Sequence, residues 1–229
     1  PASLGNERLD AKTIASWGCE FFKYDFCHHN RISGDCPAIE HIVITKPKSA
    51  FEIDLRPEDA EFTGRAKIIK MSDVPSKKAI GFISHGSGSA SFNFDADEKG
   101  EYVLTFVFHK SMAKKKQYMQ IHINGKMYEI FFPETKGFSP LGRQQIIVEL
   151  KEGTNNMTIK NPVATAIDSS YIQYKRMGNA LKEASSMWAK VTHSEEKPIT
   201  YSICEWGMAR PYLWGAKAGS MWRTTPDIA

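Results

Sequence analysis

Two aspartates stand at the ends of short apolar or aromatic runs near opposite ends of the chain. Lys23-Tyr24-Asp25 closes the first run, and Trp222 to Asp227 closes the last one. Cleavage of a glycosidic bond needs two carboxylates, a cation such as Lys23 or Arg223, and flanking aromatic rings. In that reaction one carboxylate attacks the anomeric carbon and the other protonates the leaving oxygen. By spacing alone, a strand-end aspartate is more typical of a turn or a helix cap.

The elements that must position these groups alternate between helix and strand. The sequence predicts a helix over 3–18 and a buried strand over 19–24, and later a helix over 177–191 and a strand over 199–204. A loop-and-helix stretch over 210–219 and a third short strand over 220–224 follow. This alternation indicates an α/β fold with a parallel sheet. In a (β/α)8 barrel the reacting groups lie at the carboxyl ends of such strands.

The middle of the chain, from about 51 to 174, has the pattern of an all-β domain. The turn Asn124-Gly125 between two alternating runs is its strongest hairpin signal, because a type I′ turn needs two positive φ angles. Short β-rich runs predict strands over 79–84, 89–94, 102–108, 118–123, 127–132, 145–150, 156–159 and 166–174. Their number and spacing favour a β-sandwich inserted into the chain of the α/β domain.

Composition excludes several other classes. The 229 residues carry a formal net charge of +4, too mild to imply a nucleic acid partner, and contain no apolar run long enough to span a membrane. Four cysteines are too few for a disulfide scaffold. The chain begins at Pro1 without a signal peptide and stops directly after an apolar stretch, so we expect it to be a fragment of a longer protein.

Longer motifs resemble the α-galactosidases of glycoside hydrolase family 27. They are PASLGNERLDAKTIASWG and FFKYDFC within 1–30, and YKRMGNAL, ITYSICEWG and WGAKAGSMWRTTPDI within 174–228. They follow the order of the fourth to sixth strands of the family's barrel. The fold class implied is a partial (β/α)8 TIM barrel interrupted by a jelly-roll-like sandwich.

The resemblance assigns the segments of the chain. Segment 1–36 would hold barrel helix 3 and strand 4, 37–53 a linker, and 54–173 the inserted sandwich. Segment 174–229 would hold helix 4, strand 5, helix 5 and strand 6.

The same resemblance implies roles for individual residues. Asp25 would be the nucleophile and Asp227 the general acid/base of a retaining double displacement without a cofactor. Lys23 and Arg223 would bind sugar hydroxyls, and Lys23 lies on the side of its strand that Asp25 shares. The residues that would line the pocket near the 2-hydroxyl are Cys204, Glu205 and Trp206.

Some features depart from the family pattern or leave the activity open. Pro226 stands where glycine is usual, and the aspartate pair that binds galactose O4 and O6 in relatives lies before Pro1. The same resemblance implies that Glu205 would favour galactose over N-acetylgalactosamine, because relatives that accept the acetamido group carry a smaller residue there. The alternatives are α-N-acetylgalactosaminidase, β-L-arabinopyranosidase or isomaltodextranase activity, or a carbohydrate-binding protein without catalysis.

The insert resembles carbohydrate-binding modules of families 6 and 35. The motifs that carry this resemblance include PEDAEFTGRA, AIGFISHGSGSASFNF, VELKEGTNNMTI and AIDSSYIQY. Tyr102, Phe106 and Phe108 alternate on one strand and are predicted to be core rather than a sugar platform. The partner expected from both resemblances is an α-galactoside oligosaccharide or polysaccharide, and a structural calcium ion in the sandwich is an option.

Two interpretations fit the group Cys27, His28, His29 and Cys36: a metal site, or a disulfide between Cys27 and Cys36. The disulfide is favoured. Localisation and oligomeric state stay open, with a lean towards a secreted or extracytoplasmic protein.

Overall fold

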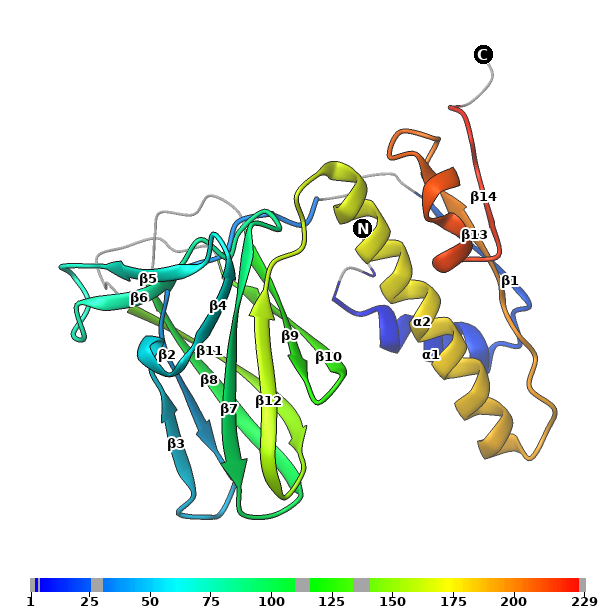
Figure 1. Cartoon of the computed structure of the whole chain (residues 1–229). Helices are drawn as coiled ribbons and strands as arrows, with labels where there is room; N and C mark the ends of the chain where they lie inside the picture. The colour runs from blue at the N-terminus through cyan, green and yellow to red at the C-terminus, as the bar shows by residue number, and fades with distance from the viewer. Residues whose placement is uncertain (1–2, 4, 26–30, 110–115, 134–140, 227–229) are drawn as a thin grey trace. The chain divides into compact units, whose positions relative to one another are not determined.

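The chain folds into two compact units. The structure is a computed structural model and describes residues 3, 5–25, 31–109, 116–133 and 141–226 (Figure 1). One unit is formed by Pro1–Ile32 and Ala166–Ala229, and the other by Ser33–Thr165. None of the helices in these described ranges is long and apolar enough to cross a membrane.

The Ser33–Thr165 unit consists of two antiparallel sheets. The first follows the order β11-β8-β2-β6-β5, with β3 paired to β2: Leu141–Leu150, Gly100–His109, Ile39–Thr45, Lys78–Gly81, Lys67–Lys70 and Glu52–Leu55. The second follows the order β10-β9-β12-β7-β4: Lys126–Phe132, Gln117–Ile123, Gly153–Lys160, Gly88–Ala96 and Glu61–Gly64. A short 3-10 helix, η1 (Pro57–Asp59), connects β3 to β4. The predicted sandwich is therefore confirmed.

Aromatic side chains fill the core between these two sheets. Tyr102, Phe106 and Phe108 on β8 are buried, as their alternation predicts. The rings of Phe106 and Phe108 meet Phe132 of the opposite sheet, with centroids 6.2 and 4.9 Å apart in edge-on geometry. These rings join the two sheets.

The hairpin between β9 and β10 has the predicted turn. Asn124 and Gly125 have φ angles of 50° and 84°, as a type I′ turn requires. The Asn124 amide nitrogen donates to Asn155 Oδ1 at 2.7 Å, and the Asn156 N–H donates to Asn124 Oδ1 at 3.1 Å. The turn residue therefore also ties the hairpin to β12.

Asn161 joins the two ends of the sandwich segment. Its side chain is completely buried, and its Nδ2 donates to the carbonyl oxygens of Ser33 at 3.0 Å and Asp35 at 3.1 Å. Its Oδ1 accepts from the Val163 N–H at 3.0 Å. One amide thus links residues 33–35 at the start of this unit to residues 161–163 near its end.

The other unit is α/β. Its elements are α1 (Glu7–Ser16), β1 (Phe21–Asp25), α2 (Ala166–Thr192), β13 (Thr200–Cys204), the 3-10 helices η2 (Pro211–Leu213) and η3 (Gly215–Lys217), and β14 (Met221–Trp222). The described strands form a parallel sheet in the order β1-β13-β14. Ala11 and Ile14 of α1 share one buried cluster with Leu181 of α2 and Ile203 of β13. The prediction of parallel strands with helices is confirmed, and the eight-stranded barrel stays a prediction.

The prediction of a linker over 37–53 is wrong. This segment contains β2 and the first two residues of β3, and Ile42 and Ile44 of β2 are completely buried. A bulge shifts the register between Ile39 and His41, but buried and partly exposed residues alternate from Glu40 to Thr45. This alternation and the β-branched run Ile42–Thr45 favour a strand over a linker.

The prediction of a strand over 166–174 is also wrong, because Ala166–Thr192 is one continuous helix. Ile167, Tyr171 and Tyr174 recur at the spacing of a helix face as well as in a β-rich run. Asp168 in the first turn suits the positive end of the helix dipole. The strand that was expected to end the sandwich is instead the first part of α2.

Truncating the inter-sheet aromatic core should destabilise the sandwich strongly. We expect Phe106→Ala to lower the free energy of unfolding by about 3–5 kcal/mol, because a buried ring is replaced by a cavity. Ile147→Ala on β11, where the side chain is 62% exposed, is the matched control and should change it by less than about 0.5 kcal/mol. Urea unfolding followed by circular dichroism measures both, and equal effects would contradict this account of the core.

Candidate active site

Parallel register brings three predicted site residues to one edge of the α/β sheet. Asp25 at the end of β1 lies opposite Cys204 at the end of β13. Ile203 lies opposite Trp222 of β14, and the next residue, Arg223, donates its backbone N–H to the Ile203 carbonyl at 3.0 Å. Asp25, Cys204 and Arg223 therefore form a row across the carboxyl ends of neighbouring strands.

Strand β1 separates polar from buried side chains by alternation. Lys23 and Asp25 are exposed, and Tyr24 between them is buried. The Tyr24 ring packs edge-on against Tyr174 of α2, with centroids 5.7 Å apart, and lies 6.4 Å from the Tyr201 ring of β13. The aromatic contacts fix the strand, and the alternation then places Lys23 and Asp25 on the same side.

Glu205 follows β13 directly and is completely buried. Its Oε1 accepts a hydrogen bond from the Ala209 N–H at 2.6 Å. Its Oε2 is buried and has no hydrogen-bond partner among the described residues. Burial raises the pKa of the Glu205 carboxyl, and the Ala209 N–H opposes this to a smaller degree.

The chain after Glu205 forms a tight turn. Trp206 and Gly207 have φ angles of 61° and 80°. A Cβ atom on Gly207 would lie 2.1 Å from the Thr224 carbonyl oxygen, so only glycine allows this approach. The buried Trp214 donates its Nε1–H to the Ala209 carbonyl at 2.8 Å. These contacts hold the turn in one conformation.

Tyr174 on α2 is a residue of this site that the sequence did not reveal. Its side chain is completely buried, and its ring lies 5.7 Å from that of Trp214. Burial is the largest cause that raises the pKa of the Tyr174 hydroxyl. The nearby acidic groups of Glu205, Cys204 and Asp25 raise it further, so Tyr174 stays protonated. Its position as the first residue of the motif YKRMGNAL was the one available signal.

The remaining predicted residues have different outcomes. Trp206 is half-buried beside Glu205, and Arg223 is half-buried after β14. Asp227 lies outside the described residues, so its distance from Asp25 stays a prediction. Cys27, His28 and His29 also lie outside them, while Cys36 is a free cysteine. Within the described ranges, no group of three or more His, Cys, Asp or Glu side chains is placed to hold a metal ion.

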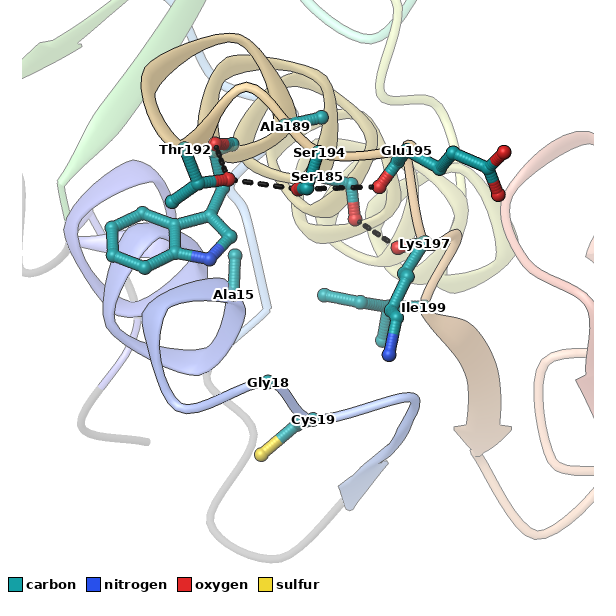
Figure 2. A pocket seen from close by; sticks show the side chains of 11 residues that line it. Ala15, Gly18, Cys19, Ser185, Ala189, Thr192, Ser194, Glu195, Lys197 and Ile199 are labelled. Atoms are coloured by element: carbon teal, nitrogen blue, oxygen red, sulfur yellow. Dashed lines mark hydrogen bonds between the residues drawn. The ribbon is translucent and has the colours of Figure 1, made fainter.

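A pocket of about 350 Å³ lies within the same unit but away from these residues (Figure 2). Gly18 and Cys19, which precede β1, and Lys197 and Ile199, which precede β13, contribute to its lining together with side chains of α2. Ser185 on α2 donates to the Lys197 carbonyl at 2.8 Å across it. The pocket therefore belongs to the amino ends of the strands, and the predicted site residues lie at the opposite ends.

Comparison with known proteins shows sequence similarity to α-galactosidases. No family model matches the chain. An α-galactosidase from Cyamopsis tetragonoloba is 38% identical over 61 residues, which are 25% of this chain and 15% of that protein. An α-galactosidase from Coffea arabica is 61% identical over 33 residues, 14% of this chain and 9% of that protein. A probable α-galactosidase B from Aspergillus oryzae is 39% identical over 70 residues, 31% of this chain and 14% of that protein.

The resemblance to the α-galactosidases is confirmed. The matched parts span well under a fifth of the length of these α-galactosidases. Among solved structures, a family 35 carbohydrate-binding module from Clostridium thermocellum matches 47% of this chain and 83% of its own, at 18% identity and a TM-score of 0.43. A family 35 module of Cellvibrio japonicus Abf62 matches 54% of this chain and 83% of its own, at 18% identity and a TM-score of 0.39.

The turn after Glu205 should require glycine at position 207, because glycine has no Cβ atom. We expect Gly207→Ala to destabilise the α/β unit by about 1–2 kcal/mol for the left-handed backbone and by about 1–3 kcal/mol more for the collision with Thr224. Gly18→Ala is the matched control, because Gly18 also has a positive φ (70°) but open space around it.

All five tryptophans lie in the α/β unit, so tryptophan fluorescence during urea unfolding reports on this unit. Equal losses of stability in the two variants would show that the close approach to Thr224 does not hold the turn.

Proposed function

We propose that this chain is part of a retaining α-galactosidase that removes terminal α-galactosyl residues. The observation that carries the proposal is the row of Asp25, Cys204 and Arg223 across the carboxyl ends of β1, β13 and β14. Strands that neighbour each other in chain order, with polar groups at their carboxyl ends, suit a (β/α)8 barrel. The α/β unit would then supply barrel strands four to six.

The reaction would proceed in two displacements at the anomeric carbon. The Asp25 carboxylate attacks this carbon while Asp227 gives its proton to the leaving oxygen, which forms a covalent glycosyl-enzyme. Asp227 then takes a proton from water, the water oxygen attacks the same carbon, and Asp25 leaves as a carboxylate. This geometry requires the two carboxyl groups to lie about 5–5.5 Å apart.

Neighbouring groups would prepare and select the sugar. Lys23 shares the exposed side of β1 with Asp25, and a cation there favours the ionised nucleophile. Arg223 and Lys23 would donate hydrogen bonds to sugar hydroxyls. Cys204, Glu205 and Trp206 would surround the 2-hydroxyl, where the bulk of Glu205 disfavours an acetamido group.

We expect hydrolysis to depend on both carboxylates. In the longest open reading frame that contains this chain, Asp227→Asn should lower kcat for nitrophenyl α-galactoside by about 10²–10⁴-fold, because general acid catalysis is lost. Asp25→Asn should remove turnover altogether, because no glycosyl-enzyme can form. Glu196→Gln is the control, since Glu196 is exposed in the α/β unit.

Comparison with the N-acetylgalactosaminide and with β-L-arabinopyranoside substrates tests the specificity. Preference for either of them over the α-galactoside would overturn the proposed substrate. Full activity of Asp25→Asn would overturn the proposed mechanism.

A second candidate function, sugar binding by the sandwich, is favoured by the surroundings of Phe82. This ring follows β6, is 46% exposed and sits on a residue with a φ of 61°. Such backbone strain in an aromatic residue persists only where the surrounding structure imposes it. Ser87 Oγ lies 2.8 Å from the Phe82 carbonyl oxygen and 2.6 Å from that of Ser84, which fixes the loop.

Cations accompany this exposed ring. Arg65 Cζ lies 5.9 Å and Lys67 Nζ 5.0 Å from the ring centroid. A fixed aromatic ring can stack on the C–H face of a sugar, and adjacent N–H donors can bind its oxygens. The Phe82 loop would thus retain a polysaccharide substrate near the enzyme without taking part in the reaction.

We expect Phe82→Ala to weaken glycan binding by at least about tenfold, the loss of a contact worth about 1.4 kcal/mol. Glycan-array screening identifies the ligand, and calorimetry with that oligosaccharide measures its Kd. Ile147→Ala removes another exposed apolar side chain of the sandwich and should leave Kd unchanged. Binding that survives Phe82→Ala would exclude this ring as the platform.

A further inference from the structure

Glu205 is buried in surroundings that suit a neutral acid and do not suit a carboxylate. Its side chain has no exposed surface, and one backbone N–H, from Ala209, is its hydrogen-bond donor. The second oxygen, Oε2, is covered and has no partner among the described residues. A buried carboxylate with a single hydrogen bond and no counter-ion is costly, whereas a protonated carboxyl carries no charge to desolvate.

Several titratable groups of the described residues lie around this end of the sheet. Tyr174 faces Glu205 from α2, while Asp25 and Cys204 end β1 and β13. Arg223 follows β14, and Arg210 in the loop before η2 is exposed. Among the described residues, the Ala209 N–H donates to Oε1 of Glu205, and Oε2 has no hydrogen-bond partner. Burial accordingly raises the pKa of its carboxyl.

We propose that Glu205 in the sugar-free protein keeps its proton, on Oε2, to a higher pH than an exposed glutamate does, and that it acts there as a neutral positioning group. Through Oε1 it accepts the Ala209 N–H that closes the 205–209 turn, and its proton leaves the covered Oε2 without a charge. A neutral Glu205 also adds no negative charge beside Asp25. This last consequence rests on the proposed function, because it matters only if Asp25 is the nucleophile.

Protonation of Glu205 has a definite effect on stability. A folded-state pKa above the value of about 4.3 for an unfolded glutamate means that the folded chain binds this proton more tightly. The resulting stabilisation is fully present below that value and is lost as the pH rises through the pKa of the folded state. An ion-paired glutamate would behave in the opposite way and stabilise the fold at higher pH.

The test compares urea unfolding of the wild-type chain with that of Glu205→Gln from about pH 5 to about pH 9. Tryptophan fluorescence reports on the α/β unit, since Trp17, Trp188, Trp206, Trp214 and Trp222 all belong to it. We expect the urea midpoint of the wild type to fall with rising pH relative to Glu205→Gln, which cannot ionise. Glu196→Gln, at an exposed glutamate, should follow the wild type. A constant or rising difference between wild type and Glu205→Gln overturns the proposal.

A second measurement does not require a variant to fold. In wild-type chain labelled with ¹³C at the glutamate carboxyl carbons, one resonance should titrate at higher pH than all the others. Titration of every glutamate near 4.3 would overturn the proposal. Neither experiment uses a sugar, so an inactive enzyme would count against the proposed function and leave the state of Glu205 unaffected.

Discussion

The parallel register of β1, β13 and β14 is the constraint on which the candidate site depends. A strand shifted by one residue would turn Lys23 and Asp25 inward and bring Tyr24 to the surface. The rings of Tyr24, Tyr174 and Tyr201 pack together in one buried cluster and hold this register. The apolar core therefore decides which polar groups meet at the sheet edge.

The same end of the sheet combines a rigid turn with an incompletely satisfied acid. Gly207 lies against the Thr224 carbonyl, Trp214 holds Ala209, and Ala209 holds Glu205. This chain of contacts keeps a buried carboxyl in place although one of its oxygens has no partner among the described residues. Unsatisfied buried groups are uncommon in folded proteins and tend to occur where a ligand or a proton is handled.

Much of the fold follows from local patterns. The Asn124-Gly125 hairpin, the core side of β8 and the helix after Met177 could be predicted because each has a clear period or turn signal. The start of α2 could not, since short apolar runs fit helix and strand alike. Strand β2 did carry a local signal, because its residues alternate in burial from Glu40 on and Ile42–Thr45 are β-branched. The row of Asp25, Cys204 and Arg223 could be anticipated from strand ends. The burial of Glu205 and the presence of Tyr174 depend on tertiary contacts that no spacing records.

The amide of Asn161 bears on how such a protein could arise. Because Nδ2 binds the carbonyl oxygens of Ser33 and Asp35 near one end of the sandwich segment, entry and exit of that segment are fastened to each other. A segment whose two ends are held close together can be inserted into a surface loop without separating the residues on either side of the insertion point. A chain that lacks residues 33–165 would therefore need only a short connection in their place.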